Sequence, residues 1–307
     1  MSRAVVFAYH NVGVRCLSVL LDVGVDVALV VTHQDAREEH IWFDSVIACA
    51  TRNNLPYITP EDPNTANIIE QIAALQPDFI FSFYYRHMLK PTLLAIPTHG
   101  AYNMHGSLLP HYRGRVPVNW AIIHGEKQTG ATLHIMTEKP DAGDIVAQTA
   151  VPILQDDLAI DVFHKVVCAA EHTLHRVLPA LLAGTAPTIA QDIRLGSYFS
   201  GRRPEHGRID WMQSARHIHN LIRAVAPPYP GAFSTLLDQP LRVLRSRVID
   251  DFSPAHAKPV FFCDNHAFYV HCGGGGTLQL LELEWAGQTP SALNCSDITA
   301  GQTIDLV

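Results

Sequence analysis

The chain has 307 residues, of which 48% are hydrophobic and 17% charged, and its formal net charge is −7 with the histidines neutral. This composition is typical of a globular protein, and the length predicts about two domains. No run of about 18 apolar residues occurs in the sequence, so we expect no membrane span. The acidic balance argues against a partner that is bound mainly through a phosphate backbone, so we expect no nucleic-acid partner.

The N-terminus indicates a cytoplasmic protein. His10, Asn11 and Arg15 interrupt the segment that a signal peptide would need to be apolar. The cysteines are scattered without C-x-x-C spacing, and in a cytoplasmic protein this predicts reduced, mostly buried thiols. They are Cys16, Cys49, Cys168, Cys263, Cys272 and Cys295.

Predicted strands and helices alternate in the first third of the chain, which favours an α/β fold. Strands are expected at residues 4–9, 25–32, 56–58 and 78–83, with helices after residue 14, around residues 42–53 and from Asn64 or Thr65 to Leu75. The turn after the first strand, residues 10–13, contains a single glycine. It lacks the G-x-G-x-x-G pattern of dinucleotide sites, so we expect a nucleotide-binding type of fold without an NAD site.

Residues 101–144 contain the side chains that are best suited to catalysis. Asn103 and His105 are two residues apart on a predicted strand, so their side chains point the same way. A second predicted strand, residues 131–136, leads into a loop that contains Asp141, at a strand end where open α/β sheets place ligands. An amide donor, an imidazole and a carboxylate suit acyl transfer to an amine. The structural alternative is a buried Asn and His bonded to backbone, with Asp141 in an ordinary turn.

The rest of the chain predicts three further helices, a linker and a β-rich C-terminal part. Pro117 is expected in the first turn of a helix that ends near His124, followed by a strand at residues 143–153 and a long amphipathic helix at residues 160–182. That helix carries His164, Cys168, Glu171, His172 and His175, but one helix face rarely completes a four-coordinate site, so no metal is expected.

Residues 184–208 are rich in glycine and proline and predict a bridge between domains. After a helix that ends near Ala224, short strands are expected at residues 233–237, 241–249, 259–263, 267–272 and 277–285, with the glycines 273–276 as a hairpin turn. This pattern suggests a small barrel.

Three segments closely resemble the signature of the 10-formyltetrahydrofolate-dependent formyltransferases. They are N-M-H-G-S-L-L-P at residues 103–110, R-G at 113–114 and D-A-G at 141–143. The resemblance covers essentially the whole chain. The resemblance is most detailed to one subgroup, the formyltransferase domain of the bifunctional polymyxin-resistance enzyme. It is carried by residues 5–10, 81–87, 112–115 and 201–203.

This resemblance implies an α/β fold, with a Rossmann-like formyltransferase domain and a mostly parallel sheet at residues 1–200, then a small OB-like β-barrel domain at residues 201–307. It implies transfer of the formyl group of 10-formyltetrahydrofolate, a co-substrate, to the 4-amino group of a UDP-linked amino sugar, specifically UDP-4-amino-4-deoxy-L-arabinose, a step of lipid A modification. The alternatives are another amino-sugar nucleotide, methionyl-tRNA, or a binding protein without catalysis. Methionyl-tRNA formyltransferases have a longer basic insertion near residues 34–40, which this sequence lacks.

The resemblance also implies roles for individual residues. Asn103 would stabilise the oxyanion, His105 would act as general acid and base, and Asp141 would favour the charged form of His105 and relay the amine's proton through water. Folate contacts are implied for His87, Met88, Leu89, Arg115, Thr137, Glu138, Lys139, Pro140 and Asp141. The Leu109–Pro110 bond is expected to be cis, as in relatives. Whether the chain stands alone or is one domain of a bifunctional protein is left open, as is its oligomeric state.

Overall fold

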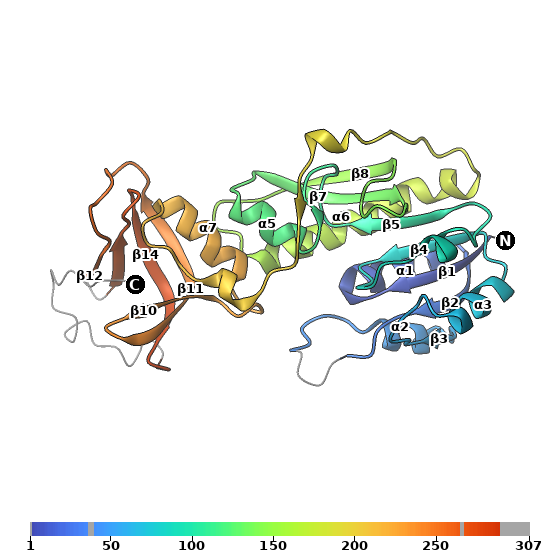
Figure 1. Ribbon diagram of the computed structural model, residues 1–307, viewed down its shortest axis with the longest axis horizontal. Coiled ribbons are helices and arrows are strands. Elements are labelled where there is room, and N and C mark those ends of the chain that lie inside the picture. The colour runs from blue at the N-terminus through green and yellow to red at the C-terminus, as the bar shows by residue number, and fades with distance from the viewer. Residues whose placement is uncertain (1, 36–39, 265–266, 289–307) are drawn as a thin grey trace. The chain divides into compact units, whose positions relative to one another are not determined.

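A computed structural model describes residues 2–35, 40–264 and 267–288 (Figure 1). The chain divides into two compact units: the first comprises residues 1–117, 128–151 and 164–200, and the second residues 118–127, 152–163 and 201–307. The second unit therefore also takes two segments from the range that the sequence assigns to the N-terminal domain, and a simple boundary after residue 200 stays a prediction. None of the helices within the described ranges is both long enough and apolar enough to cross a lipid bilayer.

The first unit is built on a seven-stranded sheet with the strand order β3-β2-β1-β4-β5-β7-β8 (Figure 1). Its strands are β1 (Arg3–Ala8), β2 (Asp26–Val31), β3 (Tyr57–Ile58), β4 (Phe79–Phe83), β5 (Ala101–His105), β7 (Gln128–Ile135) and β8 (Ile145–Pro152). The pairs β1/β2, β1/β4, β2/β3 and β4/β5 are parallel, whereas β5/β7 is antiparallel. The predicted α/β class with a mostly parallel sheet is confirmed.

All but one of the helices described next lie close to positions predicted for them, and the exception is the short helix at residues 91–94, which was not predicted. They are α1 (His10–Asp22), α2 (Val46–Arg52), α3 (Ala66–Ala74), α4 (Pro91–Leu94), α5 (Pro117–Ile123) and α6 (Ala159–Leu182). The expected turn at residues 10–13 is instead the first turn of α1. Helix α2 begins later than expected because Ser45 caps it, its hydroxyl accepting a hydrogen bond from the Ala48 N–H at 3.2 Å. Thr65 is the N-cap of α3, one of the two residues predicted for that position.

The core of the first unit lies on the central strands. All five residues of β4 are buried, and the rings of Phe79, Phe81 and Phe83 stack along one face with centroids 5.7 Å apart. Strands that are covered on both faces consist of continuous apolar runs, and both β1 and β4 have this character. A second group of buried residues includes Phe7, Leu29, Ile72, Ile80 and Leu89. This packing holds the carboxyl ends of β1, β4 and β5 in place.

The second unit contains α7 (Ala215–Val225) and a five-stranded antiparallel sheet in the order β10-β11-β14-β13-β12. The strands are β10 (Ala232–Leu236), β11 (Gln239–Asp250), β12 (Val260–Asp264), β13 (Ala267–His271) and β14 (Thr277–Trp285). The apolar side of α7, with Ile218 and Ile222, packs in the same core as Phe261 and Leu280. The separate C-terminal β domain is confirmed, whereas closure of its sheet into a barrel stays a prediction.

The cysteines agree with the expectation of reduced thiols at four positions and contradict it at one. Cys16, Cys49, Cys168 and Cys272 are free, and burial raises the pKa of Cys272 to about 12. Cys263 is disulfide-bonded, so the expectation is wrong there. A disulfide joins cysteines that folding brings together, whatever their spacing in the sequence, so the lack of a C-x-x-C pattern could not exclude it.

Candidate active site

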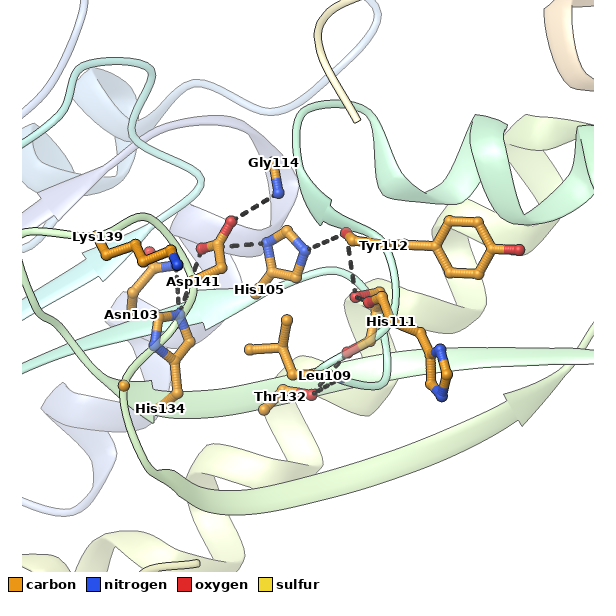
Figure 2. Close-up of polar contacts among 12 residues, drawn as sticks. Asn103, His105, Leu109, His111, Tyr112, Gly114, Thr132, His134, Lys139 and Asp141 are labelled. Carbon is orange, nitrogen blue, oxygen red and sulfur yellow. Dashed lines mark hydrogen bonds and ion pairs between the residues drawn. The ribbon is translucent and has the colours of Figure 1, made fainter. Parts of the chain in front are cut away.

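Two neighbouring antiparallel strands bring the candidate residues together. In the register of β5 and β7, Asn103 lies opposite His134, and His105 lies opposite Thr132. Side chains of directly opposed residues project from the same face of a sheet. The loop that follows β7 then places Asp141 beside the rings of His105 and His134 (Figure 2).

The distances in this group are short. The Asn103 amide nitrogen Nδ2 lies 3.1 Å from His134 Nε2, and the Asp141 carboxylate oxygen Oδ1 lies 3.6 Å from His105 Nδ1 and 3.5 Å from His134 Nε2 (Figure 2). The side chains of His105, His134 and Asp141 are only 7%, 3% and 13% exposed. The structure therefore brings Asn103, His105 and Asp141 into one buried polar group, in which His134 is a fourth member.

His134 is the residue that the sequence analysis missed. It lies within the predicted strand at residues 131–136, two residues after Thr132, so the two side chains point to the same face of the sheet. A histidine in a buried strand is an available signal, because an imidazole in an apolar environment needs hydrogen-bond partners. The sequence alone does not say that Asn103 is one of them.

Backbone carbonyls determine which nitrogen of each imidazole carries a hydrogen. His105 Nε2 lies 2.8 Å from the Tyr112 carbonyl oxygen, and His134 Nδ1 lies 2.9 Å from the Ile135 carbonyl oxygen. A carbonyl can only accept, so these two nitrogens are the donors. The other nitrogen of each ring, His105 Nδ1 and His134 Nε2, faces Asp141 Oδ1.

Asp141 is held as an ionised carboxylate. Burial by itself would raise the pKa of Asp141, but the attraction of His105, the contact with His134 and the N–H of Gly114 outweigh burial and lower the pKa far below its usual value. The Gly114 N–H donates to Oδ2 at 2.8 Å. The backbone of Asp141 has a φ of +50°, in the left-handed region that a residue with a side chain seldom adopts, and such conformations concentrate at functional sites.

Thr132 holds the turn that follows β5. Its hydroxyl donates to the Ser107 carbonyl oxygen at 2.6 Å and accepts from the Leu109 N–H at 3.2 Å. Gln148 adds hydrogen bonds to Thr132 Oγ1 at 2.9 Å and to the Leu109 carbonyl oxygen at 2.8 Å. The Leu109–Pro110 bond is cis, as predicted, and a second cis bond joins Pro227 and Pro228.

The residues expected to contact folate differ in their exposure to solvent. His87, Met88 and Arg115 are exposed, as are Thr137, Glu138 and Lys139, while Pro140 is half-buried. Leu89 is only 2% exposed, and its side chain packs in the core. All of these folate contacts stay predictions.

A cluster of aromatic rings lies at the carboxyl ends of β1, β2 and β4. We call it the aromatic cluster, and it consists of Tyr9, His10, His33, Trp42, Phe43, Tyr84, Tyr85 and His87. The Arg86 guanidinium lies 4.5 Å from the centroid of the Tyr9 ring. A Cβ atom on Gly106, the residue after His105, would come 2.0 Å from the Tyr84 hydroxyl oxygen. The aromatic cluster therefore adjoins the buried polar group at the sheet edge where α/β proteins bind ligands.

Helix α6 carries the histidines that were considered as possible metal ligands. In the described part of the chain, no group of three or more His, Cys, Asp or Glu side chains is placed to hold a metal ion. Glu171 instead forms a two-point ion pair with Arg15 of α1, at 2.7 and 2.6 Å.

Comparisons with known proteins agree with this architecture. The family model described as formyl transferase matches residues 14–178, and the one described as formyl transferase, C-terminal domain, matches residues 202–302. An N-formyltransferase from Helicobacter canadensis, solved with folinic acid and dTDP-3-aminofucose, is similar in structure with a TM-score of 0.70 and 21% identity, over 91% of this chain and 99% of that one.

Two further solved structures resemble the chain. WlaRD, a sugar 3N-formyl transferase solved in the presence of dTDP and 5-N-formyl-THF, has a TM-score of 0.71 and 20% identity, over 91% of this chain and 97% of that one. A 4-N formyltransferase from Francisella tularensis has a TM-score of 0.62 and 21% identity, over 76% of this chain and 91% of that one. At these identities the likeness shows a common fold. Because the first family model spans more than half of the 307 residues, the chain belongs to the formyl transferase family and is a formyltransferase.

Proposed function

We propose that the protein transfers the formyl group of 10-formyltetrahydrofolate to the 4-amino group of a UDP-linked amino sugar, with UDP-4-amino-4-deoxy-L-arabinose as the specific acceptor. The observation that carries the proposal is the buried polar group of Asn103, His105, His134 and Asp141 at the end of β5 (Figure 2). It combines an amide donor, two imidazoles that each turn one ring nitrogen toward the same carboxylate, and that carboxylate in its ionised form. Formyl transfer to an amine needs a donor for the oxyanion and a base for the amine's proton.

In the proposed first step, the uncharged amine attacks the formyl carbon. A carbon–nitrogen bond forms while the carbonyl π electrons move onto oxygen, which gives a tetrahedral oxyanion. The Asn103 amide nitrogen carries two hydrogens, and the contact with His134 uses one of them. The other hydrogen is then suited to donate to the oxyanion, with the amide held in place by His134.

The amine's proton is transferred next. His105 Nδ1 receives it, directly or through a water molecule, because Nε2 is already bonded to the Tyr112 carbonyl. Asp141 stabilises the resulting imidazolium from 3.6 Å. The intermediate collapses as the bond between the formyl carbon and N10 breaks, and N10 takes the proton so that tetrahydrofolate leaves. Since only an uncharged amine attacks, we expect the rate to fall at low pH.

The surroundings of the site favour a small nucleotide-linked acceptor. The aromatic cluster and Arg86 provide stacking surfaces for flat rings such as a base or a pterin. The net charge of −7 disfavours tRNA, whose binding depends on neutralising many phosphates. Lipid A modification and a cytoplasmic location are part of the same proposal.

A dTDP-linked amino sugar is the second candidate acceptor. Two of the structurally similar proteins were solved with dTDP or with a dTDP-linked amino sugar. The two candidates differ in the thymine methyl group, in the 2′-hydroxyl of the ribose and in the amino sugar itself. A site that hydrogen-bonds the 2′-hydroxyl would discriminate strongly between them.

One set of incubations tests the proposal. The protein is mixed with 10-formyltetrahydrofolate and, separately, with UDP-4-amino-4-deoxy-L-arabinose, a dTDP-linked 3-amino or 4-amino sugar, or methionyl-tRNA, and both tetrahydrofolate and the formylated acceptor are measured. We expect the highest kcat/KM with the UDP-linked sugar and little dependence on salt. A preference for a dTDP-linked sugar rejects the acceptor, and steeply salt-dependent formylation of tRNA rejects the substrate class. Wild-type turnover in His105→Ala or Asn103→Ala rejects the mechanism.

A further inference from the structure

The loop between β5 and α5 is held by a short strand from much later in the chain. Strand β6 (Arg113–Gly114) pairs in parallel with β9 (Tyr198–Phe199), which lies in the segment that the sequence predicts as a linker. The Arg113 N–H donates to the Ser197 carbonyl oxygen at 3.0 Å, and the Arg115 N–H donates to the Phe199 carbonyl oxygen at 2.9 Å. The Ser197 hydroxyl oxygen accepts a hydrogen bond from the Tyr112 N–H at 2.9 Å.

The same loop contacts both His105 and Asp141. The Tyr112 carbonyl oxygen accepts from His105 Nε2 at 2.8 Å, and the Gly114 N–H donates to Asp141 Oδ2 at 2.8 Å (Figure 2). Three of the four N–H groups from Tyr112 to Arg115 thus bind the later segment, and the fourth binds the carboxylate. The position of this loop decides where two polar contacts of the candidate active site lie.

The loop has an uncommon conformation and little free space. Tyr112 has a φ of +57°, and Gly114 has a φ of +96°, both in the left-handed region. A Cβ on Gly114 would lie 2.1 Å from the Phe199 carbonyl oxygen, and a Cβ on Gly196 would lie 2.1 Å from the Pro110 carbonyl oxygen. The rings of Tyr112 and Phe199 stack with centroids 5.4 Å apart. Such a backbone persists only where its surroundings hold it.

We propose that Ser197 is a positioning residue for formyl transfer, acting through the backbone of Tyr112 on the tautomer and orientation of His105. Its hydroxyl fixes the N–H side of Tyr112, and the carbonyl oxygen of Tyr112 in turn keeps the hydrogen of His105 on Nε2. Proton exchange is thereby directed to Nδ1, beside Asp141. This inference rests on the proposed function, because it assumes that His105 moves the amine's proton.

The test compares three variants of the full chain. Ser197→Ala removes the acceptor of the Tyr112 N–H, Ser197→Thr keeps a hydroxyl, and Leu195→Ala alters an exposed side chain in the same segment. We expect Ser197→Ala to lower kcat about tenfold, which corresponds to about 1.4 kcal/mol, with KM for both substrates within about twofold of wild type. Ser197→Thr should keep kcat within about threefold, and Leu195→Ala should match wild type, within the scatter expected of surface substitutions.

A second measurement is independent of turnover. Nitrogen NMR of the labelled protein reports which ring nitrogen of His105 carries the hydrogen. We expect Nε2–H in the wild type and in Ser197→Thr, and a mixture of the two tautomers in Ser197→Ala.

The two measurements also separate this inference from the proposed function. If the wild type formylates none of the acceptors, the proposed function fails, while the NMR comparison still tests the role of Ser197. An unchanged tautomer in Ser197→Ala overturns the positioning role. A kcat of Ser197→Ala within about twofold of wild type also overturns it, because surface substitutions without such a role have small effects. The same holds if Ser197→Thr loses as much kcat as Ser197→Ala, or if Leu195→Ala does.

Discussion

The exchange Asp141→Asn removes one charge from the centre of the polar group and nearly preserves its shape. The asparagine side chain can still accept the Gly114 N–H, which lies 2.8 Å from Oδ2 in the wild type. What it cannot supply is the negative charge 3.6 Å from His105 Nδ1. At an effective dielectric constant of about 20, a unit charge at that distance stabilises an imidazolium by roughly 4–5 kcal/mol.

The expected loss is smaller than this Coulomb energy, because Asp141 also faces His134 and is 13% exposed. Taking about two-thirds of it, we expect the transition state to lose about 3 kcal/mol, so that kcat falls about 100-fold while KM changes little. The assay is steady-state formyl transfer at saturating folate. Asp144→Asn, the same substitution three residues later, is the matched control and should keep wild-type kcat. A kcat for Asp141→Asn within about threefold of wild type would refute the electrostatic role, since the calculated loss is much larger.

The same variant should also change how the free energy of unfolding depends on pH. The pKa of Asp141 is lower in the folded protein than in the unfolded chain, so the unfolded chain binds more protons in acid. The carboxylate therefore contributes stability above its unfolded pKa of about 3.9, and this contribution is lost as the pH falls below about 4. Urea unfolding should show the free energies of wild type and Asp141→Asn converging over that acidic range. Curves that stay parallel there would contradict the low pKa.

Three further outcomes are expected. His134→Ala removes the partner of the Asn103 amide and should lower kcat about 10–100-fold at nearly unchanged KM for the acceptor, measured by initial rates; an unchanged kcat would leave His134 without a role. His219→Gln should destabilise the protein more at pH 7 than at pH 5 in urea unfolding, because burial lowers the pKa of His219 in the fold and only the unfolded chain gains a proton just below about pH 6.5. An equal destabilisation at both pH values would show that His219 has an ordinary pKa. Ile72→Ala, at a fully buried position, should cost about 2–4 kcal/mol of unfolding free energy and leave kcat at 25 °C within about twofold; a cost below about 1 kcal/mol would contradict its place in the core.

The positions of strands and helices could be predicted closely because they depend on local patterns. The strand expected at residues 78–83 is β4, and the five strands expected after residue 232 are β10 to β14. Observed boundaries differ from the predicted ones where a single side chain determines them. Ser45 is an example, because its hydroxyl caps α2, which begins later than the apolar pattern suggests. The disulfide at Cys263 shows the opposite case, in which a covalent contact has no local signal.

The candidate site divides in the same way. Asn103, His105 and Asp141 were predicted from residue types at strand ends and from a resemblance, and the structure places them within one group. Leu89 packs its side chain in the core, and the folate contact expected of it stays a prediction. His134 was missed because its partnership with Asn103 depends on the antiparallel register of β5 and β7.

The order and the chemistry of the residues, read alone, were sufficient for the fold class, the family and three members of the polar group. The fold class follows from the periodicity of apolar residues, whereas the family and the three side chains were predicted from residue types at strand ends and from a resemblance to a known family. Only the tertiary structure decided which nitrogen of His105 and of His134 lies against a backbone carbonyl, and that Ser197 binds Tyr112 from 85 residues away. These features depend on carbonyls and hydroxyls from other elements, and their positions are set by strand register and loop path, which local sequence patterns do not specify.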